Sequence, residues 1–251
     1  MMIIDNFKFR NHRYVELAGR IYRKNSDQKA GVIFSHGLFS SKDGYKITQM
    51  AGSILDSGFA LMTFDFTFSG ESPGKIADIS ITDEVDDLKC AINFFKSRGF
   101  EKIHLMGSSM GAAVTVLTAA TGQFEIESLI LIAAPLSFEK LVPEIKRDHL
   151  NDLDLKGYTS VSGVMVNNGF IREIFEIDMI EAVKKITSPV LLIHGRQDAV
   201  VDYSNHETFI GNCTSECVSL VIDDGDHNLT RDSDIKIISE NVKGWLGKFN
   251  V

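Results

Sequence analysis

One strand–turn–helix segment constrains the fold of this chain more than any other. An apolar run (residues 102–106) typical of a buried strand leads into Gly107-Ser108-Ser109-Met110-Gly111, and an apolar run (residues 112–120) typical of a buried helix follows. A G-x-S-x-G sequence in this setting places the serine on a sharp turn with its hydroxyl exposed. Glycine at both ends prevents side chains from colliding where strand and helix cross. Only Ser109 has glycine two residues before and after it, so Ser109 rather than Ser108 is predicted at the turn.

Apolar strands and amphipathic helices alternate along most of the chain. Short apolar runs predict buried strands at residues 31–35, 59–64, 129–134, 189–193 and 217–222. Between them, apolar residues at helical spacing predict helices, and Thr82 is predicted to cap the helix that ends near Gly99. Because the strands are apolar throughout, we expect an α/β fold with a mostly parallel sheet and helices on both faces. The alternating segment at residues 14–22 predicts an antiparallel edge strand.

The alternation stops between Pro135 and Pro189. This stretch contains a short helical piece around residues 138–149, a β-rich segment (residues 158–175) with Asn167-Asn168-Gly169 as its turn signal, and a helix near residues 178–185. We interpret residues 136–186 as a short lid over the sheet edge where active sites gather, and residues 1–135 and 187–251 as the core. We expect most of the lid's apolar side chains to form its own small core and a few to line a pocket: Phe138, Leu141, Val142, Tyr158, Val161, Met165, Phe170 and Phe175.

Composition and charge exclude several functional classes. The 251 residues are 44% hydrophobic, enough for one large domain, and a net charge of −8 with interspersed signs argues against nucleic acid or an anionic membrane surface as partner. The N-terminus has no signal-peptide pattern, and no run approaches about 18 apolar residues, so no membrane span is expected. Three cysteines (Cys90, Cys213 and Cys217) indicate free thiols, and we expect a cytoplasmic protein without a metal site.

Ser109 becomes a useful nucleophile only with a base, an acid that orients the base, and N–H donors for the oxyanion. His227 is the one histidine in a loop after the last predicted strand. Asp198 closely follows the preceding strand, whereas Asp202 is predicted to open the next helix as its N-cap. The expected oxyanion donors are the backbone N–H of Met110 and that of Leu38, in the loop after the strand at residues 31–35.

The other histidines are predicted to lie outside the site. His104 is expected to be a core residue because it stands in the middle of a strand. His12, His149 and His206 are expected to be solvated because polar residues surround them.

Together these motifs resemble the α/β-hydrolase family. The resemblance covers nearly the whole chain and includes the order Ser…Asp…His. It rests on His36-Gly37, the loop Asp65…Gly70-Glu71-Ser72, the turn at Ser109, His194-Gly195…Asp198 and Gly225-Asp226-His227. The short insertion with its predicted hairpin is similar to that of small-lid esterases, which include bacterial cinnamoyl (feruloyl) esterases. The loop after Asp65 differs from theirs, since Phe68 stands where a small residue is usual, and Asp65 is interpreted as a structural residue that holds this loop.

The resemblance implies a serine hydrolase that cleaves small to medium acyl or aryl carboxylic esters through an acyl-enzyme on Ser109. Asp198 and His227 would complete the triad, with no cofactor and a small-molecule ester as partner. A thioesterase remains open, as does an aminopeptidase or amidase whose lid carboxylates grip a substrate amine: Glu139, Glu144, Glu173 and Glu176. The alternative from a different class is a non-catalytic small-molecule receptor on the same fold. The oligomeric state, including a homodimer, also stays open.

Overall fold

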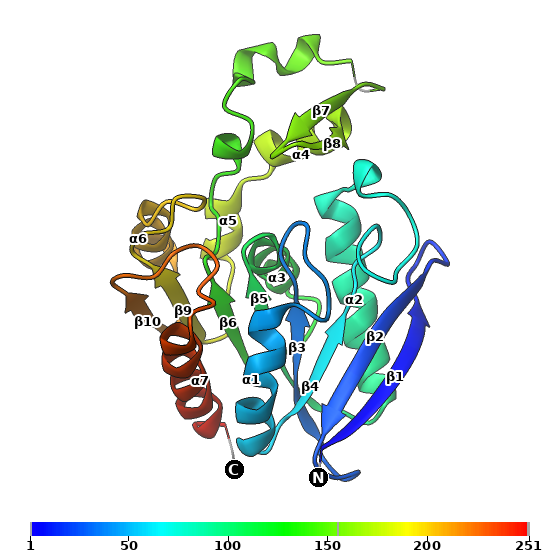
Figure 1. Ribbon diagram of the computed structural model, residues 1–251, viewed down its shortest axis with the longest axis vertical. Helices are drawn as coiled ribbons and strands as arrows, with labels where there is room; N and C mark the ends of the chain where they lie inside the picture. Colours follow the sequence, from blue (N-terminus) through cyan, green and yellow to red (C-terminus); the bar gives the residue numbers. More distant parts are fainter. Residues whose placement is uncertain (1, 155, 250–251) are drawn as a thin grey trace.

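An eight-stranded sheet forms the centre of the computed structural model, which describes residues 2–154 and 156–249 apart from the side chains of Leu141 and His149. The strand order is β1-β2-β4-β3-β5-β6-β9-β10 (Figure 1). The strands are β1 (Ile3–Arg10), β2 (Glu16–Arg23), β3 (Ala30–Ser35), β4 (Ala60–Phe64), β5 (Lys102–Ser108), β6 (Ser128–Ile132), β9 (Val190–Gly195) and β10 (Cys217–Ile222). β1, β2 and β4 pair antiparallel, and all other neighbours pair in parallel. The predicted α/β fold with a mostly parallel sheet is therefore confirmed, but β1, not the strand predicted at residues 14–22, forms the edge.

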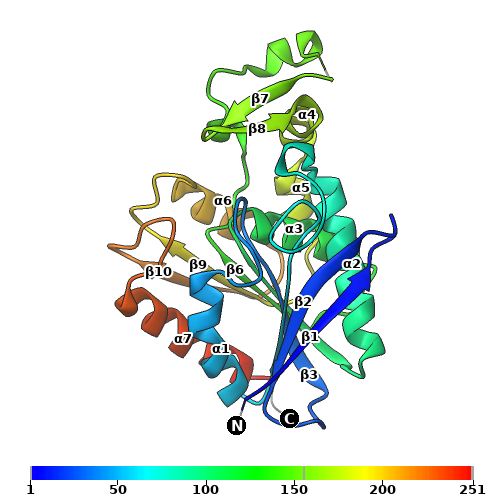
Figure 2. The same cartoon turned by 45° about the vertical axis from the view of Figure 1, so that its right-hand side comes forward.

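Helices cover both faces of the sheet. On one face α1 (Tyr45–Asp56) packs against α7 (Asp232–Gly247), and on the other lie α2 (Ile81–Ser97), α3 (Met110–Ala120) and α5 (Met179–Lys184), with α6 (Ser204–Asn212) beside α5 (Figure 1, Figure 2). Side chains of neighbouring residues in one strand pack on opposite faces of the sheet. In β3, Ile33 belongs to the apolar cluster under α2 and α3, and Val32 belongs to the cluster under α1 and α7. Burial on both faces explains why the central strands are apolar throughout.

Two predicted capping and turn signals were wrong by a few residues. α2 begins before Thr82, and Ser80 is its N-cap, accepting the N–H of Asp83 at 3.2 Å. The predicted hairpin exists as β7 (Tyr158–Val161) and β8 (Val164–Asn167), but its turn is Ser162-Gly163, where both residues have positive φ. Asn167 instead caps α4 (Asn168–Glu176). Asparagine suits turns and N-caps about equally, so the residue type alone did not separate the two.

The insertion, defined here as residues 136–186, lies above the carboxyl ends of the parallel strands (Figure 1). It contains two short 3₁₀ turns, η2 (Glu139–Leu141) and η3 (Arg147–Asp152), then the β7–β8 hairpin, α4 and α5. The expectation that its apolar side chains form a small core of their own was wrong, because the buried ones join the cluster between the sheet and α2 and α3: Val142, Val161, Phe170 and Phe175. Tyr158 and Met165 are exposed instead. The predicted side chain of Leu141 lies outside the described part.

Two polar side chains tie α4 to the start of α2. Glu173 accepts the backbone N–H of Ile81 at 2.9 Å, at the positive end of the α2 dipole. The Asn167 amide donates to the carbonyl oxygens of Ala77 and Ile79 at 3.0 and 2.9 Å. These contacts hold the hairpin and α4 over the sheet edge.

His104 is a buried core residue of β5, as predicted. Its Nδ1 and Ser128 Oγ are hydrogen-bonded at 2.7 Å, and Ser128 also accepts the indole N–H of Trp245 at 3.0 Å. Burial lowers the pKa of His104 to about 4. The expectation for His206 was wrong: it is buried on α6, with Nε2 2.8 Å from Ser219 Oγ.

Acidification should destabilise the fold through His104. Its pKa in the folded chain, about 4, lies below the reference value of 6.5, so protonation favours the unfolded chain. Its contribution to stability is complete above about pH 6.5 and is lost as the pH falls towards 4, by up to about 3 kcal/mol. Thermal unfolding between about pH 7.5 and 4.5 should therefore show a steeper fall of Tm for wild type than for His104→Gln.

The control for this measurement is His12→Gln, since His12 is exposed as expected. It should keep the wild-type slope, whereas equal slopes for wild type and His104→Gln would contradict the prediction. The side chain of His149, also expected to be solvated, is outside the described part.

Candidate active site

The structure places Ser109 at the turn between β5 and α3. Its backbone has φ 55° and ψ −123°, a conformation that residues with a side chain rarely adopt. A Cβ on Gly107 would lie 2.3 Å from the carbonyl oxygen of Gly111, and a Cβ on Gly111 would lie 2.2 Å from that of Ser35. The first glycine therefore lets the turn close on itself, and the second lets α3 approach the end of β3.

Ser109, His227 and Asp198 form one hydrogen-bonded chain. His227 Nε2 lies 3.1 Å from Ser109 Oγ, and His227 Nδ1 lies 2.8 Å from Asp198 Oδ2. The three residues follow the carboxyl ends of β5, β10 and β9. A histidine that donates Nδ1–H to a carboxylate keeps Nε2 free to accept the serine proton, so this arrangement can activate the hydroxyl.

A contact between two glycines brings the Asp198 and His227 loops together. A Cβ on Gly195, at the end of β9, would lie 2.4 Å from the carbonyl oxygen of Gly225, after β10. The same carbonyl accepts the N–H of Gln197 at 2.9 Å. Because backbone touches backbone here, the spacing of the two loops is narrowly defined.

The Asp198 carboxylate is buried and fully hydrogen-bonded. Oδ1 accepts the N–H groups of Val200 and Val201 at 2.9 and 2.7 Å, while Oδ2 faces His227 and also lies 3.4 Å from His194 Nε2. Burial alone raises the pKa of Asp198, but the hydrogen bonds from His194 and His227 together hold it well below its usual range. Asp198 is therefore a stable anion beside the imidazole.

Asp202 lies away from this chain. Its side chain is half exposed, its Oδ1 accepts the N–H of Ser204 at 3.0 Å, and its Oδ2 lies 3.4 Å from Lys140 Nζ. The N-cap of α6 is Tyr203 rather than Asp202, so the predicted N-cap was wrong by one residue. The side chain still holds the start of α6.

Leu38 and Met110, the predicted oxyanion donors, lie at the cavity that contains Ser109. Among the described residues neither backbone N–H donates to an acceptor. His36 holds the Leu38 loop in place, since its Nδ1 lies 2.9 Å from the Gly37 carbonyl oxygen and its Nε2 accepts the N–H of Phe66 at 3.2 Å. The loop after β3 is thereby attached to the loop after β4.

Asp65 has the structural role that was predicted for it. Its carboxylate accepts the N–H of Lys42 at 2.6 Å and that of Glu71 at 2.9 Å, and it pairs with the buried Lys42 ammonium at 3.1 Å. Gly70 has φ +55° and a Cβ there would overlap the carboxylate. Phe68, which stands where the small-lid esterases usually have a small residue, also has a positive φ, of 75°.

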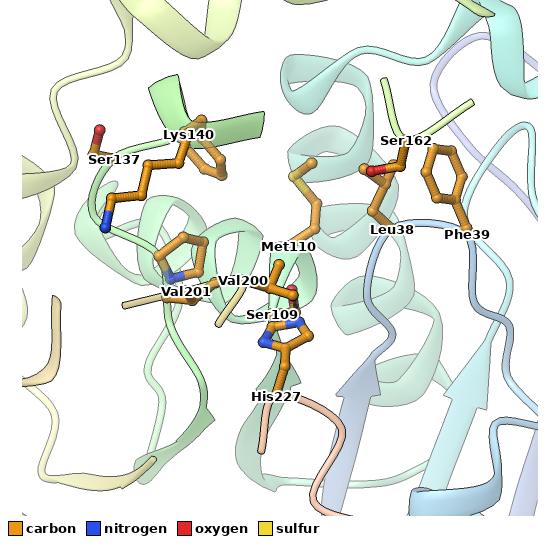
Figure 3. Close-up of a pocket in the computed structure, with 12 residues that line it drawn as sticks. Leu38, Phe39, Ser109, Met110, Ser137, Lys140, Ser162, Val200, Val201 and His227 are labelled. Carbon is orange, nitrogen blue, oxygen red and sulfur yellow. Dashed lines mark hydrogen bonds between the residues drawn. The ribbon is translucent and has the colours of Figure 1, made fainter. Parts of the chain in front are cut away.

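An apolar cavity of about 170 Å³, called here the insertion-side cavity, opens at Ser109. Figure 3 shows Ser109 and His227 at its lower end, with Leu38, Phe39 and Ser162 on one side and Ser137 and Lys140 on the other. Of the insertion's predicted pocket candidates, Phe138 lines this cavity. The described lining residues include no aspartate or glutamate.

Two residues near the site were given no role from the sequence. His194, at the end of β9, contacts Asp198, and Lys46, on α1, donates to Ser108 Oγ at 3.1 Å. The sequence does contain a signal for Lys46: a lysine in the first turn of a helix is unfavourable, because its charge opposes the helix dipole. His194 stands four residues before Asp198, and this spacing does not indicate a role in the site.

The fold and the geometry at Ser109 define an α/β-hydrolase of the serine-hydrolase type. A model of the family described as serine aminopeptidase, S33, matches residues 26–155, just over half of the chain, and the chain belongs to this family.

Relatives and solved structures agree with this assignment. The chain is 23% identical over 248 residues to the mitochondrial palmitoyl-protein thioesterase ABHD10 of Rattus norvegicus, covering 94% of this chain and 81% of the relative. Its fold is similar to that of Est1E from Butyrivibrio proteoclasticus with ferulic acid bound (TM-score 0.82, 21% identity, 96% and 98% of the two chains). It is also similar to mouse α/β hydrolase domain-containing protein 10 (TM-score 0.80, 19% identity, 98% and 100%).

Among the residues that the structure describes, no helix is both long and apolar enough to cross a membrane. No group of three or more histidine, cysteine, aspartate or glutamate side chains in that part of the chain has a metal-binding arrangement.

Substituting Gly111 should destabilise the whole protein. Gly111→Ala places a Cβ against the carbonyl oxygens of Ser35 and His36, and relief requires a backbone shift costing about 3 kcal/mol or more. Thermal unfolding should show a Tm lower by roughly 6–12 °C. The matched control is Gly244→Ala on α7, where nothing lies within 4 Å, and it should stabilise by up to about 1 kcal/mol. Similar Tm values for the two variants would contradict the contact.

Proposed function

We propose that this chain hydrolyses small to medium acyl or aryl carboxylic esters through an acyl-enzyme on Ser109. Ser109 Oγ attacks the ester carbonyl carbon while His227 Nε2 accepts the hydroxyl proton, and Asp198 stabilises the imidazolium that results. His227 then donates this proton to the leaving alcohol as the C–O bond breaks. Water, deprotonated by His227, attacks the acyl-enzyme, releases the acid and restores Ser109.

The observation that carries this proposal is the hydrogen-bonded chain of Ser109, His227 and Asp198 at the end of an apolar cavity. The N–H groups of Leu38 and Met110 are the proposed donors to the oxyanion, since both lack a described acceptor and both residues line the cavity that contains Ser109. The insertion serves as the proposed lid that excludes water from the acyl chain.

Ester hydrolysis is favoured over cleavage of aminoacyl amides by the lining of the insertion-side cavity. A substrate ammonium needs a carboxylate, and none of the four candidate glutamates of the insertion lines this cavity. Glu173 accepts N–H groups at the start of α2, Glu139 pairs with Arg147 at 2.9 Å, and Glu176 with Arg172 at 3.8 Å. Glu144 is exposed and does not line the cavity.

Thioester hydrolysis is the second candidate, because relatives spanning nearly the whole chain are named palmitoyl-protein thioesterases. The same acyl-enzyme serves both reactions, and a thiol leaves more easily than an alcohol. A cytoplasmic location stays a prediction beside these relatives, which are named mitochondrial.

Substrate profiling tests the reaction class. The wild type should hydrolyse short p-nitrophenyl esters or methyl ferulate faster than an aminoacyl-p-nitroanilide, and Ser109→Ala should abolish turnover while its Tm stays close to wild type. Activity confined to the anilide would shift the assignment to a peptidase. No turnover of any of these substrates, together with resistance of Ser109 to a fluorophosphonate, would favour the non-catalytic small-molecule receptor.

The choice of acid is tested by a matched pair of aspartate variants. Asp198→Asn removes the charge that orients His227 and should lower kcat by about 10³–10⁴-fold. Asp202→Asn should change kcat less than about threefold, since its carboxylate only holds the start of α6. The opposite ranking of the two kcat values would identify Asp202 as the acid.

A further inference from the structure

A second cavity borders Ser109, and no described residue of the insertion lines it. This α1-side cavity has a volume of about 210 Å³ and is lined by the first turn of α1, the loop after β3 and the residues after His227. Leu38, Ser109 and His227 line both cavities. An ester bound at Ser109 therefore has one cavity for each of its two arms.

Lys46 is the lysine of this cavity, and its placement is unfavourable in the absence of an anion. As the second residue of α1, it stands at the positive end of the helix dipole. Its ammonium donates to Ser108 Oγ at 3.1 Å, and no described carboxylate lies within 4.0 Å of it. Burial lowers the pKa of Lys46 to about 8, although Asp198, Asp226 and Asp234 act to raise it.

The start of α1 adds positive potential to the same cavity. Its N-cap is Gly44, which has no side chain to accept a helix N–H, and its first turn contains no acidic residue. Gly44, Tyr45, Lys46 and Ile47 all line the cavity. An oxyanion in this place would accept hydrogen bonds at the end of the helix and neutralise the Lys46 ammonium at once.

We infer that the α1-side cavity binds an oxyanion, a carboxylate or a phosphate, carried by the leaving group of the ester, and that Lys46 recognises it. The inference rests on the proposed function, because it assigns this cavity to the leaving-group side of Ser109. The acyl arm then occupies the insertion-side cavity, whose lining is mostly apolar. Lys140, the lysine on that side, is exposed and already paired with Asp202 at 3.4 Å.

Two matched esters test this assignment. 3-Butanoyloxy-4-nitrobenzoic acid releases a nitrophenolate that carries a carboxylate, and 3-butanoyloxy-4-nitrobenzamide releases a nitrophenolate of nearly the same shape with an uncharged carboxamide in its place. The readout is the ratio of kcat/KM for the acid to that for the amide. Wild type should prefer the acid, and in Lys46→Met the ratio should fall by about tenfold or more, mainly through KM for the acid.

Two further lysine variants make the result specific. Lys236→Met removes an exposed lysine of α7, away from the site, and should keep the wild-type ratio. Lys140→Met should also keep it. An unchanged ratio in Lys46→Met overturns the inference, and so does a fall confined to Lys140→Met, which would place the leaving group in the insertion-side cavity.

Binding without turnover separates this inference from the proposed function. Calorimetric titration of Ser109→Ala with 3-hydroxy-4-nitrobenzoate and with phenyl phosphate should show affinity that falls about tenfold when Lys46→Met is added. The oxyanion that loses more affinity is the one that the site prefers. Lys46-dependent binding in a protein that hydrolyses neither ester supports the oxyanion site and contradicts the proposed function. Turnover of both esters without any Lys46-dependent binding supports the proposed function and contradicts the oxyanion site.

Discussion

Close contact between backbones, available only where glycine stands, is the constraint on which the geometry at Ser109 depends. Gly111 lets α3 reach the carbonyl oxygens at the end of β3, and Gly195 meets the backbone of Gly225 between the loops after β9 and β10. Side chains are absent from both contacts, so their spacing leaves little room for adjustment. The separation of Ser109, Asp198 and His227 is therefore determined largely by main-chain packing, and the hydrogen bonds between them complete an arrangement that the backbone has already set.

The sheet and the position of Ser109 were predictable because each depends on a pattern within a few residues. Apolar runs identified the central strands, and the G-x-S-x-G spacing identified the turn. Asp198 and His227 were predicted from their place after successive strands, since the carboxyl ends of parallel strands meet at one edge. The wrong predictions concern polar residues that are compatible with several local structures. Ser80 rather than Thr82 caps α2, and His206 is buried, because tertiary packing decides between such alternatives.

Two charged groups near the proposed nucleophile differ in how completely the protein supplies them with hydrogen-bond partners. The Asp198 carboxylate accepts two backbone N–H groups and faces two imidazoles, so its charge is fully stabilised by the fold. The Lys46 ammonium donates to one hydroxyl and otherwise faces a cavity. A buried charge with all its hydrogen-bond partners serves to orient its neighbours, whereas a partly buried charge with few partners is available to a ligand. This contrast separates a group that positions His227 from a group suited to binding.

Among the residues that the structure describes, the buried apolar side chains of the insertion share one interior with the main body. Val161 and Phe170 belong to the same continuous cluster as Leu105 of β5 and Leu88 of α2. Segments that share one core gain their stability together, so the insertion and this face of the sheet should melt in a single cooperative transition rather than as two units. The same continuity limits evolutionary exchange: a relative's insertion can replace this one only if the residues beneath it on α2 and α3 change as well.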